Sequence, residues 1–168
     1  MTDIIFLILL VFHITAIVAW MGGGVLFVSV VTPSLRDMSP SSKGEFIRST
    51  LPRYFRFITA SSIAALVAGL LLYGYITVAA TSLAPTSSGQ IYIQAGAVLG
   101  LIALIFVLGF AMPAGRKLVS LTNQTAKAPS ENMEGQMASL QRRLAMGARL
   151  GVVLLAITLV LMVLGVEL

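Results

Sequence analysis

The residues from Phe6 to Pro33 decide the fold, and they read FLILLVFHITAIVAWMGGGVLFVSVVTP. This stretch is long enough to cross a bilayer, because about 20 apolar residues suffice at about 1.5 Å of rise per residue. It carries the only histidine of the chain, His13, and the only tryptophan, Trp20. The two are seven positions apart, so both lie on one face of the predicted helix. An ionisable group inside a membrane helix indicates a functional site.

The composition of the chain is that of an integral membrane protein. Of its 168 residues, 58% are hydrophobic and only 10% are charged, and a soluble domain of this size needs more polar surface. We expect a single transmembrane domain over residues 1–168. The absence of cysteine excludes disulfides, thiolate metal sites and iron–sulfur clusters.

Four apolar segments predict an all-α, four-helix membrane bundle. They run over Ile4–Val31, Phe57–Ala80, Ile91–Met112 and Leu150–Val166. A cytoplasmic helical extension is predicted over about residues 130–149, before the last span. In it Met133, Met137, Leu140 and Leu144 form an apolar stripe at helical spacing. We expect the stripe to pack on the first connection or on the membrane surface, rather than on a partner helix.

The connections between the spans alternate sharply in charge. All eleven basic residues fall in the first connection, Thr32 to Arg56, and the third, Pro113 to Arg149, while the second, Thr81 to Gln90, has no charge. The positive-inside rule places the first and third connections in the cytoplasm and both chain termini outside. The basic balance therefore reflects topology, and we expect a lipid bilayer and no nucleic acid as partner. The expected location is the plasma (inner) membrane of a prokaryote, crossed several times.

A weak internal repeat relates the two halves of the chain. The first span ends in Thr-Pro33-Ser-Leu-Arg36 and the third in Met-Pro113-Ala-Gly-Arg116. Each is followed by a basic segment and then by a span rich in small residues, so the sequence predicts two hairpins of the same orientation. Because proline lacks a backbone donor, we expect both helices to end at these prolines.

Small residues predict how the spans associate. Lipid gives little hydrophobic drive between membrane helices, so small side chains must let their backbones approach. Gly96 and Gly100 have GxxxG spacing on the third span, and Gly147 and Gly151 have it at the start of the fourth. We expect a close bundle, with a dimer face as a further use of these glycines.

His13 is the candidate ligand for a cofactor. It stands ten residues after Asp3, near the middle of the membrane, where imidazole can ligate haem iron or copper. Gly23 and Gly24 would admit a flat macrocycle, and Met162 is the candidate second ligand by depth. Trp20 is either core or a wall of the cofactor site. The alternative is a neutral, structural histidine that is hydrogen-bonded to a neighbouring helix.

Two segments carry a resemblance to known families. His13-Ile-Thr-Ala-Ile-Val-Ala-Trp20-Met-Gly-Gly resembles the first helix of the copper-resistance protein D (CopD-like) membrane family, and equally that of the J-type protoporphyrinogen oxidases (HemJ). Arg53-Tyr-Phe-Arg56-Phe, followed by Gly69-Leu-Leu-Leu, is similar to their second helix. The resemblance covers about the first 75 residues. It implies a four-helix membrane unit that binds haem b, with His13 as the ligand.

Departures from these families leave three functions open. The oxidase family's second histidine at the end of the first helix is missing, as is its Asn-Glu-x-Pro segment before the last helix. The first function is haem-b binding for electron transfer or tetrapyrrole oxidation, and another is copper handling. The third is a non-catalytic subunit of a larger membrane complex, with His13 structural. Whether the chain is an enzyme stays open, and we expect a homo-oligomer or a subunit of a complex.

Overall fold

The computed structural model describes residues 3–79, 81–125 and 131–167. Within these ranges all regular elements are helical. In chain order they are α1 (Ile4–Leu26), η1 (Phe27–Val31), α2 (Thr32–Asp37), α3 (Pro40–Val78), η2 (Thr81–Leu83), α4 (Ser87–Phe106), η3 (Val107–Ala111), α5 (Met112–Thr125) and α6 (Glu131–Glu167). Both η1 and η3 are single π-helical turns, and η2 is a short 3₁₀ turn.

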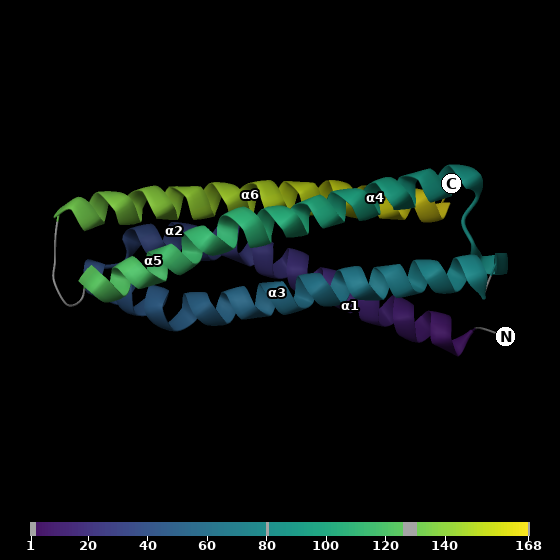
Figure 1. Cartoon of the computed structure of the whole chain (residues 1–168), viewed down its shortest axis with the longest axis horizontal. Helices are drawn as coiled ribbons and strands as arrows, with labels where there is room; N and C mark the ends of the chain where they lie inside the picture. The colour runs from purple at the N-terminus through teal and green to yellow at the C-terminus, as the bar shows by residue number, and fades with distance from the viewer. Residues whose placement is uncertain (1–2, 80, 126–130, 168) are drawn as a thin grey trace.

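These elements join into four long helices that run back and forth along one axis (Figure 1). Each is long and apolar enough to cross a membrane. Both chain ends lie at one end of the bundle, and the turn at Met38 and Ser39 lies at the other (Figure 1). The predicted all-α bundle is therefore confirmed, and its four long apolar helices are candidate membrane spans.

The helices extend well beyond the predicted apolar spans. The second begins at Pro40 rather than Phe57, so most of the basic first connection is helical. The third helix continues to Thr125, whereas the prediction ended it at Met112. The described part of the fourth helix, α6, begins at Glu131, which agrees with the helical extension predicted before the last span; residue 130 lies outside the described residues. The 39 residues of α3 reach about 58 Å, while the hydrocarbon core is about 30 Å thick. A helix of this length would extend well beyond the hydrocarbon core of a bilayer.

The prediction that Pro33 and Pro113 end their helices is wrong. Each proline stands two residues after a π-turn, and the helix continues through it as α2 or α5. In the π-turns the N–H groups of Thr32 and Met112 bond to carbonyls five residues earlier, those of Phe27 and Val107. A proline ring clashes with the carbonyl four residues before it in a regular α-helix. The wider turn moves that carbonyl aside, so the chain passes the proline without breaking.

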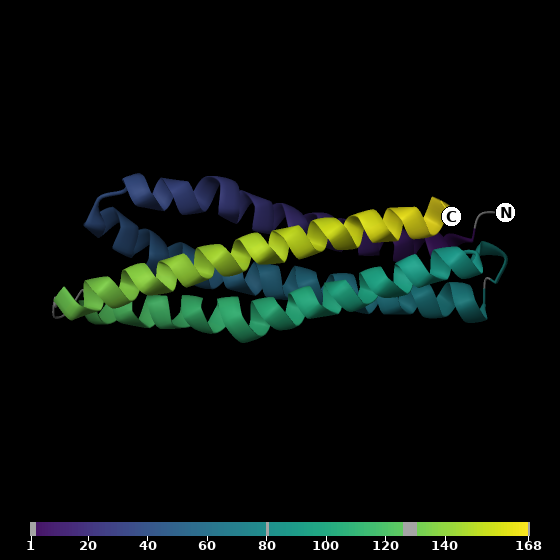
Figure 2. The same cartoon turned by 90° about the horizontal axis from the view of Figure 1, so that it is seen from above.

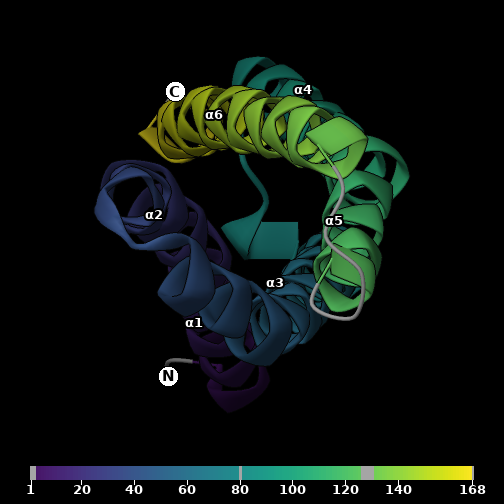
Figure 3. The same cartoon turned by 90° about the vertical axis from the view of Figure 1, so that its left-hand side faces the viewer.

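Viewed along its axis, the bundle is a ring of four helices (Figure 3). Going round the ring, the order is α1 with α2, α3, α4 with α5, and α6, which returns to α1. Consecutive helices in the chain form the two hairpins, and the most extensive contacts are those within them, α1 with α3 and α4 with α6. From above, α6 runs beside α4 and α5 along the whole length of the bundle (Figure 2).

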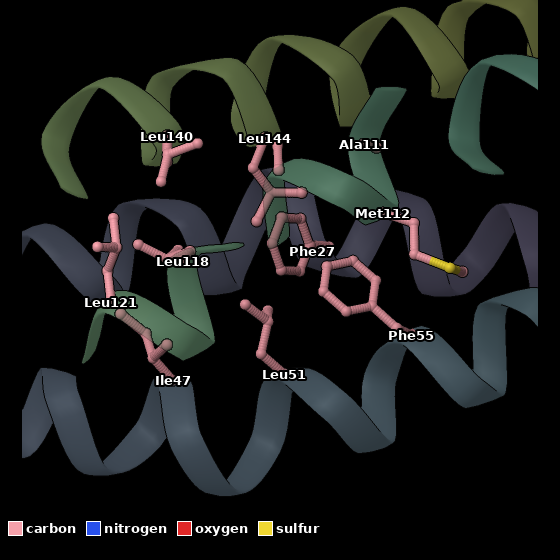
Figure 4. Close-up of a cluster of buried hydrophobic side chains, with 11 residues drawn as sticks. Phe27, Ile47, Leu51, Phe55, Ala111, Met112, Leu118, Leu121, Leu140 and Leu144 are labelled. Atoms are coloured by element: carbon pink, nitrogen blue, oxygen red, sulfur yellow. The ribbon is translucent and has the colours of Figure 1, made fainter. Parts of the chain in front are cut away.

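An apolar cluster fills the bundle at the end away from the chain termini. Side chains from η1, α3, α5 and α6 point toward one another there (Figure 4). Leu140 and Leu144 of the predicted stripe are buried in this cluster, which also holds Ile47 and Leu51 of α3. The stripe thus packs mainly on α5, and its leucines share the cluster with side chains of the predicted first connection. This cluster gives the basic end of the bundle a core of its own.

Glycines set the closest approaches between helices. A Cβ on Gly165 of α6 would lie 2.8 Å from the carbonyl oxygen of Gly89 on α4, so these two backbones touch. Gly96 faces Met162, and Gly100 faces Thr158, at the same α4–α6 contact. The GxxxG pair of the third span therefore packs within the chain, as the predicted close bundle requires.

Gly115 of α5 gives the sharpest test of this packing. A Cβ at this position would overlap the ring of Phe55, which is buried in the apolar cluster. We expect Gly115→Ala to lower the free energy of unfolding by about 1–3 kcal/mol, because the ring must move out of a packed core. Thermal unfolding in detergent measures the change. Gly22→Ala is the control, since nothing lies within 4 Å of a Cβ there. Equal midpoints for the two variants would contradict the contact.

Candidate cofactor site at His13

His13 is held by a hydrogen bond to the neighbouring helix of its hairpin. Its Nδ1 lies 2.8 Å from the carbonyl oxygen of Ala65 on α3. A carbonyl oxygen can only accept, so Nδ1 is the donor in this bond. The imidazole therefore carries a proton on Nδ1, and its orientation is fixed across the α1–α3 contact.

Gly69 makes room for this ring. A Cβ on Gly69 would lie 2.7 Å from Cε1 and 3.1 Å from Nδ1 of His13, closer than side chains normally pack. Gly69 stands one helical turn after Ala65, so the notch and the hydrogen-bond acceptor lie on one face of α3. In the sequence Gly69 was noted only within the segment that resembles the second helix of the CopD-like and HemJ families. The pairing could have been predicted from the presence of a glycine on the second span, because that span forms a hairpin with the one that carries His13.

The second ring nitrogen of His13, Nε2, has no partner in the described part of the chain. None of the hydrogen bonds found there involves it. Buried side-chain nitrogens and oxygens among the described residues all have a partner. It follows that Nε2 is not among the fully buried nitrogens of the described residues. A histidine ligates a metal through one ring nitrogen while the other donates to a carbonyl, which is the arrangement seen at Nδ1.

Trp20 lies two turns further along the same face of α1 and is buried. It packs in a mid-bundle cluster with Ala16, Ile58, Ala65, Ala103 and Leu155. The predicted shared face of His13 and Trp20 is confirmed, since both contact the α3 side of the bundle. Trp20 is a core residue that joins α1 to α3, α4 and α6.

The space beside Gly23 and Gly24 is taken up by protein side chains. A Cβ on Gly23 would lie 2.7 Å from Cδ1 of Ile58, and one on Gly24 would lie 3.0 Å from a methyl group of Val152. The hydroxyl of Tyr54 also donates to the Gly23 carbonyl at 3.4 Å. These two glycines let α3 and α6 approach α1.

Met162 and His13 pack against different helices. The side chain of Met162 lies against Gly96 of α4, with its Cε 3.2 Å from the position of a Cβ there. His13 lies against Ala65 and Gly69 of α3. Each of the two thus contacts the other helix of its own hairpin.

Polar groups tie the helices together at the end that holds the termini. Asp3 caps α1 by accepting from the Ile5 N–H at 3.0 Å, and its other carboxylate oxygen accepts from the Tyr75 hydroxyl at 2.6 Å. The Tyr75 bond, with the backbone N–H groups, lowers the pKa of the Asp3 carboxyl. The side-chain amide of Gln94 donates to the Tyr73 hydroxyl at 2.9 Å, which links α4 to α3.

Acidic and imidazole side chains do not cluster in the described part of the chain. No group of three or more among them could hold a metal ion. A metal at His13 therefore needs ligands from a macrocycle, from methionine or from another chain. Comparison of the chain with protein-family models, curated proteins and solved structures finds no match. The geometry of the site and the sequence pattern are thus the basis for assigning a function.

The fit between Gly69 and His13 can be tested by a double-mutant cycle. We expect Gly69→Ala to lower the free energy of unfolding by about 1–3 kcal/mol, because the new methyl group displaces the imidazole. In a His13→Ala background the same change should cost close to nothing. Thermal unfolding in detergent of the four proteins measures the coupling. Gly74→Ala is the control on the same helix, since a Cβ there meets nothing within 4 Å. Strictly additive effects would contradict the pairing.

Proposed function

We propose that this chain is a four-span membrane protein that binds haem b, or copper, through Nε2 of His13. This would make it a protein of the CopD/HemJ type that serves electron transfer or the handling of tetrapyrroles or metals. The observation that supports the proposal is the state of the ring. Nδ1 donates to the Ala65 carbonyl, so the lone pair of Nε2 is not used by a proton, and Nε2 is not fully buried.

A comparison of the two hairpins favours a chemical role for the imidazole. Ile93 stands 80 positions after His13, and it packs against Gly165 as His13 packs against Gly69. The π-turns before Pro33 and Pro113 have the same offset of 80. We take the hairpins as the two halves of a parallel repeat. In the second half isoleucine fills the position that histidine takes in the first, so filling the space does not by itself require an imidazole.

The protein's own contribution would be to hold and orient the ligand. Haem, when bound, would supply one-electron redox chemistry. Ala65 and Gly69 would fix the ring plane, and the bond at Nδ1 would raise the basicity of Nε2. One chain offers one histidine, which leaves five-coordinate iron, ligation by His13 with Met162, or a haem shared by the His13 residues of two chains.

A second candidate is a non-catalytic subunit of a larger membrane complex. The first span has the smallest buried share of the four. Large apolar side chains of α1, such as Ile8, Val11 and Val18, are exposed along it. This face suits lipid or a neighbouring subunit. In this reading the Ala65 bond is the whole role of His13, and copies of the chain or other subunits cover α1.

For the topology we propose that the basic end of the bundle faces the cytoplasm and both termini face outward, in a prokaryotic inner membrane. The four-span arrangement puts both termini at one end, opposite the two basic connections (Figure 1). The excess of lysine and arginine there supports this orientation.

The absorbance spectrum tests the ligand role of His13. We expect protein purified in detergent, after expression with haem precursors and copper supplied, to show a Soret band. His13→Ala should remove the band while the four spans still insert, because insertion depends on the apolar segments. Met162→Leu is the companion variant: loss of the band would indicate His–Met ligation, and one haem per two chains would indicate a shared haem.

Wild-type protein that carries neither haem nor copper under these conditions would overturn the ligand role in favour of the subunit. The matched structural control is Gly74→Ala on α3. A Cβ at this position meets nothing within 4 Å, so the variant should leave the Soret band unchanged.

Single-cysteine labelling tests the topology. The chain has no cysteine, and Ser41 and Ser87 are both exposed, at the starts of α3 and α4. We expect Ser41→Cys to react with a membrane-impermeant maleimide only after the cells are opened, and Ser87→Cys to react in intact cells. Labelling of both from the same side would refute the four-span topology.

A further inference from the structure

A cavity of about 300 Å³ opens at the basic end of the bundle, between η1, α2, α3, α5 and α6. Three cationic side chains line it, Arg36 of α2, Lys43 of α3 and Arg142 of α6. Arg36 and Lys43 stand on either side of the turn between α2 and α3, and the fold brings Arg142, about 100 residues later in the sequence, to the same cavity. No acidic side chain of the described residues lines this cavity, although Asp37 and Glu45 stand close in sequence to two of the bases.

These three bases have no partner in the part of the chain that the structure describes. None of the hydrogen bonds found there involves them, and no ion pair joins them to an acidic residue. Arg36 and Arg142 are exposed, and Lys43 is half-buried. Like charges gathered at one cavity repel one another, so an anion in it would stabilise the fold as well as bind.

The inner wall of the cavity is apolar. Phe27, Leu51 and Leu144 line it, and they belong to the apolar cluster at this end of the bundle (Figure 4). An inorganic anion gains nothing from such a wall, because it would lose water there without forming a bond. A ligand with an anionic end and a hydrocarbon end could contact both the basic side chains and the apolar wall.

On three helices the apolar wall of the cavity lies nearer the predicted membrane span than the basic side chains do. On the first helix Phe27 is nearer the apolar span and Arg36 is farther from it. On α3 Leu51 is nearer the span that begins at Phe57, and Lys43 is farther. The same order holds on α6, where the span begins near Leu150. A phospholipid in the adjacent leaflet has this order too, with its chains toward the membrane core and its phosphate outward.

We propose that this cavity binds the headgroup of an anionic phospholipid, with the phosphate held by Arg36, Lys43 and Arg142 and the glycerol end against Phe27 and Leu51. Guanidinium groups match phosphate oxygens in a planar, bidentate geometry, and lysine adds a point charge. Basic recesses between helices on the cytoplasmic side are sites where lipid headgroups bind. The site is separate from His13, which stands 23 residues before Arg36 along one helix, or about 35 Å.

The test compares two triple variants of the whole protein in detergent. The first removes the cavity charges: Arg36→Gln, Lys43→Gln and Arg142→Gln. The second removes the same charges, one lysine and two arginines, from nearby exposed positions that do not line the cavity: Arg48→Gln, Lys117→Gln and Arg143→Gln. Native mass spectrometry and thermal unfolding measure binding of dioleoylphosphatidylglycerol, with dioleoylphosphatidylcholine and inorganic phosphate as comparisons.

We expect wild type to bind phosphatidylglycerol, saturably and with a raised melting temperature. The cavity variant should bind it on the order of 100-fold more weakly, about fivefold for each removed charge. The control variant should lose little, because its three side chains are exposed and do not line the cavity, so solvent and salt screen their effect on the ligand. Phosphatidylcholine and inorganic phosphate should give no shift. The Soret band, where present, should be the same in both variants, which separates this site from the proposed haem ligand.

Three results would overturn the proposal. Equal loss in the two triple variants would mean a diffuse attraction of charges. A shift with inorganic phosphate alone would mean a site for soluble anions, and no binding by wild type would mean no site. Ala138→Phe covers the case of a cavity variant that does not fold. It fills the cavity from the exposed mouth and leaves every charge in place, and unchanged lipid binding by it would contradict the site.

Discussion

The close approach of helix backbones at glycines is the constraint on which this structure depends. In hydrocarbon each helix satisfies its own backbone hydrogen bonds, and burial of apolar side chains gives little reason for one helix to prefer another. The preference of one helix for another must therefore come from close van der Waals contact between them. Gly89 and Gly165 bring the backbones of α4 and α6 together, and Gly115 admits the ring of Phe55 between α5 and α3. Glycines thus permit close contact both within the second hairpin and between the two hairpins.

The same constraint shapes the His13 site. The notch at Gly69 allows an imidazole to lie against α3 and reach the Ala65 carbonyl, so the packing of the helices also fixes the proton on Nδ1. In the second hairpin the corresponding notch, at Gly165, holds Ile93. The first hairpin thus places an imidazole against its glycine where the second places an aliphatic side chain, and the proposed ligand belongs to the first hairpin alone.

The bundle has two zones with different physical tasks. In the membrane zone the outward side chains of α1 and its neighbours are apolar and exposed, as a lipid environment requires. The helices are longer than a bilayer requires, and the cluster around Leu51 and Leu118 fills the bundle at the end away from the termini, where burial of apolar surface from water would stabilise contacts. The proposed lipid site lies where these zones meet, because only there do apolar walls and cationic side chains border the same cavity.

By itself the sequence determined the class of fold, the number of spans, the gathering of charge at one end and the single imidazole in the first span. These are properties of individual segments, set by hydropathy and composition. The tertiary structure decided the rest: that the helices pass through Pro33 and Pro113, that His13 meets Gly69, and that Arg36, Lys43 and Arg142 share a cavity. Such features depend on how each helix is rotated and how it crosses its neighbours. Those quantities come from contacts between residues far apart in the chain, which no pattern within one segment contains.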